Sequence, residues 1–107
     1  MAAKTPKLGS SLAVGLPLLT DLILKEPDPT RRRELRAQHK ILSRHLRKLV
    51  DGNVDRATQD YKKAARALAA ANKAIREAKK DLAKVAKTIE RLAKAADLIG
   101  KVAAAAS

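Results

Sequence analysis

The chain has 107 residues, no cysteine, one aromatic residue and a net charge of +13, from 24 Lys and Arg against 11 Asp and Glu. These numbers exclude disulfides and thiolate metal sites, and they limit the fold to at most one domain with little aromatic material for its core. The excess of cations favours an anionic partner: nucleic acid, an acidic protein or an anionic membrane surface.

An apolar stretch over residues 8–24 gives the first predicted element, a short helix over about residues 11–24. Pro17 lies inside this helix and is expected to kink or split it. Asp21 interrupts the apolar run and no small-residue cleavage site follows, so we expect neither a cleavable signal peptide nor a membrane-spanning helix. Residues 1–27 are interpreted as an apolar arm that covers another helix, contacts a membrane interface or swaps between subunits.

The second predicted helix spans residues 28–50. It starts with Asp28 and Pro29, an N-cap followed by proline at the first helical position. Leucines recur along it at helical spacing, and Gly52 predicts a tight turn at residues 51–53. We therefore expect an antiparallel hairpin between this helix and the next one.

The third predicted helix is very long, because neither Gly nor Pro interrupts residues 54–99 and strong helix formers dominate them. At 1.5 Å per residue it would be a rod of roughly 70 Å, longer than the preceding helices can cover. The predicted fold is thus all-α: a basic helical hairpin over residues 28–107, with its second arm at 54–106, and a short kinked N-terminal helix. The uncovered part of the rod predicts association with other chains in a bundle or helical array.

A seven-residue repeat runs along this third helix. With Val54 at position a, every a and d position is apolar or aromatic, and the d column begins with four alanines. Such a repeat favours supercoiling around neighbouring helices, and alanine permits a close approach. The residues predicted to mediate self-association are Val54, Tyr61, Leu68, Ala71, Ile75, Ala78, Leu82, Val85, Ile89, Leu92 and Ile99.

The opposite face of the repeat is cationic, since six consecutive f positions hold Lys or Arg and no acid is among them. The simplest interpretation is a solvated helix face, and the functional alternative is contact with phosphate or an acidic surface. The predicted anion-facing residues are Arg31, Arg32, Arg33, Arg36, Arg66, Lys73, Lys80, Lys87, Lys94 and Lys101. Helical spacing also predicts local ion pairs, namely Glu77–Lys80, Asp81–Lys84, Glu90–Lys94 and Asp97–Lys101.

The sequence contains no catalytic or metal-binding motif. His39 and His45 are six residues apart, about 240° around a helix, so they cannot bind one metal ion together. Gly-rich phosphate loops, paired carboxylates and a Ser, His and Asp grouping are absent, so we expect no enzyme and no cofactor. Base-reading motifs are also absent, and Tyr61 is interpreted as a packing residue, so any nucleic-acid binding would depend on phosphate contacts and on salt.

Three functions fit these patterns. The first is a non-enzymatic structural or assembly protein that self-associates through the alanine-rich heptad face, as a component of a virion, a secretion device or a similar particle. The alternative is a small basic protein that binds nucleic-acid phosphates non-specifically. A further alternative is a membrane-active helical protein whose residues 8–24 contact the interface. We expect a homo-oligomer that is cytoplasmic or associated with a particle.

Overall fold

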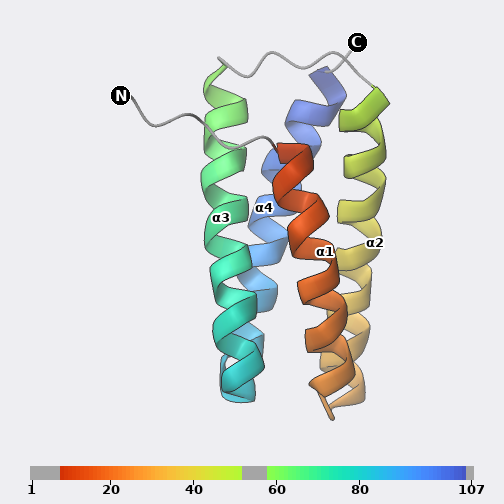
Figure 1. The fold of residues 1–107 in the computed structure, drawn as a ribbon, viewed down its shortest axis with the longest axis vertical. Coiled ribbons are helices and arrows are strands. Elements are labelled where there is room, and N and C mark those ends of the chain that lie inside the picture. The colour runs from red at the N-terminus through yellow and green to blue at the C-terminus, as the bar shows by residue number, and fades with distance from the viewer. Residues whose placement is uncertain (1–7, 52–57, 106–107) are drawn as a thin grey trace.

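The computed structural model describes residues 8–51 and 58–105, and every secondary-structure element in them is helical. Figure 1 shows four long helices side by side, in a molecule of 39 × 30 × 18 Å. The prediction of an all-α fold is therefore confirmed. The elements are α1 (Leu8–Lys25), α2 (Pro29–Asp51), α3 (Gln59–Lys80), a 3-10 helix η1 (Leu82–Lys84) and α4 (Val85–Ala105).

The four helices form a bundle of two antiparallel hairpins, α1 with α2 and α3 with α4. α1 packs against α2 and α3, and α4 packs against the same two helices. In Figure 1, α1 lies in front and α4 behind, with α3 on the left and α2 on the right. The predicted hairpin of residues 28–50 with the following helix is thus not a packed pair in the described part of the chain, because α1 and α4 lie between α2 and α3. The predicted turn at residues 51–53 lies largely outside the described residues.

The prediction of one continuous C-terminal helix is wrong, because α3 ends at Lys80 and the chain turns back. Asp81 has an extended backbone, with φ −144° and ψ 98°, and its carboxylate accepts a hydrogen bond of 3.1 Å from the Ala83 N–H. The Asp81 N–H donates to the Glu77 carbonyl, and the Asp81 carbonyl accepts from the Lys84 N–H. Aspartate offers the backbone an alternative to helical hydrogen bonds and caps the next helix. A capping aspartate therefore makes the turn without Gly or Pro.

The a and d positions of the seven-residue repeat, called the heptad stripe, form much of the core of this bundle. Most of the residues predicted to mediate self-association are buried inside the single chain: Tyr61, Leu68, Ala71, Ile75, Ala78, Val85, Leu92 and Ile99. Leu82 and Ile89 are half-buried, and Val54 lies outside the described residues. The helices that cover the stripe belong to the same chain, so no second chain is needed to bury it.

The phase of the repeat changes across the turn. In α4, Thr88 and Val102 occupy g positions and are buried, whereas Ile89 at position a is half-buried. The rotation of 100° per residue holds only within a continuous α-helix, so the extended Asp81 and the 3-10 helix η1 before α4 rotate its buried face. α4 therefore turns its d and g positions inwards, together with Ala96 and Ala103 at position a.

α1 continues through Pro17, so the expected split does not occur. Pro17 and Ala13 are exposed, and the Ala13 carbonyl, which proline leaves without an N–H partner, lies on the solvent side. By length and composition alone α1 could cross a membrane, a test that core helices and signal sequences also pass, and 33% of it is buried inside the bundle. Its inner side enters the core through Leu8, Leu12, Leu19, Leu22 and Ile23.

Two buried polar side chains of α3 hold α1 in place. The Tyr61 hydroxyl accepts a hydrogen bond of 2.8 Å from the Leu8 N–H at the start of α1. The Asn72 Nδ2 donates to the Ser11 carbonyl at 3.3 Å. Both side chains are buried, Tyr61 at 3% and Asn72 at 7% exposure. Tyr61 is therefore a packing residue that also satisfies a free N–H group of the α1 N-terminus.

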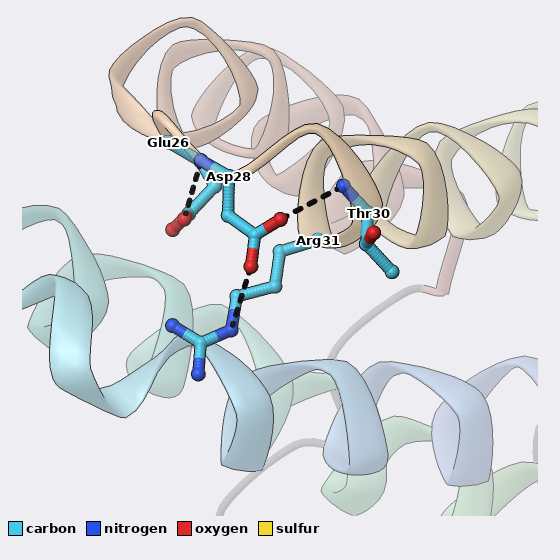
Figure 2. Close-up of polar contacts among 4 residues, drawn as sticks. All are labelled: Glu26, Asp28, Thr30 and Arg31. Carbon is cyan, nitrogen blue, oxygen red and sulfur yellow. Dashed lines mark hydrogen bonds and ion pairs between the residues drawn. The ribbon is translucent and has the colours of Figure 1, made fainter.

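Figure 2 shows the cap that starts α2. Asp28 Oδ1 accepts a hydrogen bond of 2.9 Å from the Thr30 N–H, and Asp28 Oδ2 lies 3.9 Å from Arg31 Nε. The Asp28 N–H itself donates to Glu26 Oε1 at 3.1 Å, and Glu26 is buried. The second helix thus begins at Pro29 behind an aspartate cap, as its sequence predicts.

Candidate anion-binding groove

A groove of about 550 Å³ lies between α3 and α4. Lys73 and Glu77 of α3 line one side, and Lys84, Lys87 and Arg91 line the other. The remaining lining residues are small or buried: Ala70, Ala74 and Thr88. The groove exists because the chain turns at Asp81, since that turn brings two helix faces that are distant in the sequence together.

Thr88 fixes the separation of the two walls. Its hydroxyl oxygen lies 3.2 Å from the Ala74 carbonyl of α3 and 2.9 Å from the Lys84 carbonyl, so one hydroxyl proton is shared between two helix backbones. The Thr88 side chain is 1% exposed. Ala70 and Ala74 leave the space next to Thr88 unfilled, because alanine side chains end at Cβ. The groove is therefore open to solvent, with the Thr88 contact to both helices at its base.

The groove is strongly cationic. Its four cations stand against the single acid Glu77, which leaves a net charge of +3. The cations Lys73, Lys84, Lys87 and Arg91 are all exposed. Like charges gathered on one surface raise its potential and attract anions.

No groove residue is held in an ion pair within the described part of the chain. Two ion pairs occur there: Arg31 with Asp28 at 3.9 Å, and Lys79 with Asp21 at 3.3 Å. The local pairs predicted from helical spacing are thus not formed, and that prediction is wrong: Glu77–Lys80, Asp81–Lys84, Glu90–Lys94 and Asp97–Lys101. Asp81 serves as a cap instead, and exposed pairs of this type stabilise a helix by only a few tenths of a kcal/mol.

The predicted anion-facing residues stay at the surface, but they do not form one continuous row. Arg31 and Arg32 are half-buried, and the exposed members are Arg33, Arg36, Arg66, Lys73, Lys80, Lys87, Lys94 and Lys101. Because the chain reverses at Asp81, the f positions of α3 and α4 belong to two antiparallel helices. Lys73 and Lys87, one from each helix, line the same groove.

Sequence reasoning missed Lys84 and Arg91 as members of this site. With Lys87 they have the spacing i, i+3 and i+7, which places three cations on one face of a helix. The sequence shows this spacing. It does not show that the three cations lie opposite Lys73, because only the turn before α4 brings the two helix faces together.

The two histidines lie elsewhere. His39 Nε2 is 3.2 Å from the Thr20 hydroxyl of α1, and His39 Nδ1 is 3.4 Å from the Ser43 hydroxyl. His45 lines a smaller groove of about 300 Å³ between α2 and α4, together with Ile41 and others. Burial, and then the charge of Lys48, lower the pKa of His45, while a hydrogen bond with the Ala96 backbone opposes this shift. Among residues 8–51 and 58–105, no cluster of three or more His, Asp or Glu is placed to hold a metal ion.

Comparisons with protein-family models, with curated proteins and with solved structures find no match to this chain. The fold and the charged surface are therefore the basis on which a function can be assigned.

Proposed function

We propose that this protein is a non-enzymatic nucleic-acid-binding protein that contacts phosphate groups through the α3–α4 groove. One observation carries the proposal: four exposed cations from both walls of the groove surround a single acid, and none of them is used in an ion pair within the described residues. Lys and Arg side chains at helix surfaces are the usual partners of backbone phosphates.

The arrangement supports binding along a polymer. Arg66 and Lys80 lie seven residues on either side of Lys73, and Lys94 lies seven residues after Lys87. Seven residues correspond to about 10.5 Å along a helix, so cations continue at this interval along α3 and α4 beyond the residues that line the groove. A duplex presents one charge for about every 1.7 Å of its axis, so several phosphates can meet these two rows at once.

The same structure argues against reading of bases. Tyr61 is the one aromatic residue of the chain, and it is buried in the core. Proteins that stack on single-stranded bases use exposed aromatic side chains, and lysine is a flexible point charge that carries little sequence information. Binding is therefore expected to be independent of sequence and steeply dependent on salt.

The test compares two variants that lose the same charge. The groove variant carries Lys73→Gln, Lys84→Gln and Lys87→Gln, and the control carries Arg33→Gln, Arg44→Gln and Lys48→Gln on the exposed side of α2. Binding to a short DNA duplex is measured by fluorescence anisotropy over a series of salt concentrations. The slope of log K against log salt should fall by about 3 for the groove variant, since each phosphate contact contributes about 0.9, and by less than about 1 for the control.

Two results would remove the proposal. One is the absence of binding to duplex DNA and RNA at low salt by the unchanged protein. The other is the same loss of affinity and slope in both variants, because that result assigns binding to net charge and not to the groove. Circular dichroism of both variants establishes that the helices are retained.

Assembly into a larger particle is a second candidate, and the α2–α4 groove favours it. Ile41 is 38% exposed there, and it shares the groove with Ala93 and Ala96. Gln38, His45 and Asp97 line the same groove. Since the core of the bundle is already filled, self-association would use this mixed surface around the exposed Ile41. Light scattering over a wide range of concentrations, with Ile41→Glu as the disrupting variant, tests this candidate. A monomer at every concentration rules it out.

A further inference from the structure

We infer that the outer face of α1 docks the protein on a membrane surface that carries anionic lipids. The exposed residues of this face, called the α1 face, are Ser10, Ala13, Val14, Pro17, Asp21 and Leu24. Val14 is 52% and Leu24 78% exposed, and both are large apolar side chains. The face covers about 21 Å of helix and lies at the front of the bundle in Figure 1, between α3 and α2.

Two polar side chains on this side, those of Asp21 and Thr20, already have partners. The Asp21 carboxylate accepts a hydrogen bond and ion pair of 3.3 Å from Lys79 Nζ of α3. The Thr20 hydroxyl donates to the Leu16 carbonyl at 3.1 Å and lies 3.2 Å from His39 Nε2 of α2. The one charged group of the α1 face, the Asp21 carboxylate, therefore has a cationic partner, and this pair, with the Asp21 side chain 55% exposed, can stay at the level of the polar headgroups.

Cations border the α1 face on both sides. His39 contacts α1, and Arg32 and Arg36 precede it by seven and three residues, so they lie on the α1 side of α2. On α3, Asn72 and Lys79 contact α1, and the exposed Arg76 lies between them at helical spacing. Lys25 is exposed at the end of α1 itself. An apolar strip between basic rows is the pattern of helices that lie in a membrane interface.

Several other acids lie away from the α1 face. Glu77 lines the α3–α4 groove, and Glu90 and Asp97 are on α4 at the back of the bundle. Glu34 lies seven residues before Ile41, on the side of α2 that faces α4. Glu26 follows α1 but is buried. Asp28 lies just beyond the end of α1 and is paired with Arg31 at 3.9 Å. Cations therefore outnumber acids around the α1 face.

This charge pattern decides between two occupants. Two copies of the chain that met through the α1 face would bring their bordering cations together, and like charges disfavour such contact. Anionic headgroups complement the cations, while Val14 and Leu24 can enter the boundary between headgroups and acyl chains. The helix lies on the membrane and does not cross it, because Leu12 and Leu19 on its inner side are buried in the bundle. The α3–α4 groove stays open, and this inference does not depend on nucleic-acid binding.

The experiment is a flotation assay with the full chain and two kinds of vesicle, phosphatidylcholine alone and phosphatidylcholine with phosphatidylserine. The α1 variant carries Val14→Asp and Leu24→Asp. The control carries Ala83→Asp and Ala86→Asp, which add the same charge at exposed positions of η1 and α4. The unchanged chain should bind the anionic vesicles and not the neutral ones. The α1 variant should lose at least about tenfold in affinity, and the control should stay within about threefold because its charges are screened from the membrane.

A fluorescent reporter gives a second readout that does not depend on weakened binding. The chain has no tryptophan, so Leu24→Trp introduces a single probe on the α1 face and Ala86→Trp a single probe on the opposite side. Anionic vesicles should shift the emission of the Leu24→Trp chain to shorter wavelength and leave that of the Ala86→Trp chain unchanged. No shift, equal loss of flotation in both aspartate variants, or a dimer that only the α1 variant dissociates would each overturn the inference.

Discussion

The Asn72 side chain of α3 lies against Gly15 of α1, so closely that a Cβ atom on Gly15 would stand 3.1 Å from the Asn72 Cγ atom. Asn72 is 7% exposed, and its Nδ2 donates to the Ser11 carbonyl one turn earlier in α1. The missing side chain of glycine provides the space, and the α1 backbone provides the acceptor. This contact therefore helps to set the distance and register of two parallel helices, together with the Leu8–Tyr61 hydrogen bond and the Lys79–Asp21 ion pair.

Gly15→Ala should lower the free energy of unfolding by about 1–3 kcal/mol, because the added Cβ collides with a buried side chain that cannot move without losing its hydrogen bond. Gly9→Ala is the matched control in the same helix, since its Cβ would meet Leu46 Cδ1 at an ordinary 3.8 Å. That variant should be neutral or stabilised by up to about 1 kcal/mol, through helix propensity. Urea unfolding measures both changes. Equal behaviour of the two variants would contradict the close contact.

Asp81→Ala should lower the free energy of unfolding by about 1 kcal/mol, because the turn before α4 loses its capping carboxylate. Asp81→Asn should stay within a few tenths of a kcal/mol, since its side-chain oxygen can accept the same hydrogen bond. The loss of the cap also favours a continuous helix, so Asp81→Ala should increase the population of domain-swapped dimers in light scattering at high concentration. If alanine and asparagine give the same stability, the side chain of Asp81 does not define the turn.

Ala71→Leu should destabilise the bundle by about 1–3 kcal/mol, because Ala71 is fully buried where α3 meets its neighbours and a larger side chain overfills that space. Ala69→Leu adds the same atoms at an exposed position of the same helix and should change stability by less than about 0.5 kcal/mol. Thermal or urea unfolding measures the difference. A neutral Ala71→Leu would mean that the packing there is loose.

His45 should make the stability depend on pH. Burial and the charge of Lys48 lower its pKa in the folded state below the usual 6.5, so the unfolded chain takes up a proton at a higher pH than the folded chain does. The folded state therefore has its full stability above about pH 6.5 and loses part of it as the pH falls toward the folded-state pKa. The free energy of unfolding of His45→Gln should change less with pH between about pH 5 and 7. Parallel curves for the two proteins would contradict the shift.

The sequence predicts much of this fold, and the reasons are local. Proline after Asp28 marks the start of α2, and the seven-residue repeat identifies the buried residues of α3, from Tyr61 to Ala78. Periodicity shows that a face is buried but not which chain covers it. The repeat alone therefore predicts that other chains cover its a and d positions, whereas α1 and α4 of the same chain pack against α3.

The turn at Asp81 is the main feature that the sequence concealed. The surrounding residues are strong helix formers without Gly or Pro, and a single aspartate in such a run is compatible with a continuous helix. Tertiary packing stabilises the turn, because only a reversed α4 can bury Leu92 and Ile99 within the chain. The sequence predicts each cationic f position as exposed. It does not predict the α3–α4 groove, because the groove exists only after the chain reverses at Asp81.

The proposed function requires that the cations of the α3–α4 groove bind phosphate on the outside of a closed single-chain bundle. A titration of the isotope-labelled protein with a short DNA duplex, followed through its amide and lysine side-chain resonances, tests this most directly. We expect the largest shifts at Lys73, Lys84, Lys87 and Arg91, with reversal on addition of salt. Shifts confined to the α1 face, or no shifts at low salt, would contradict it.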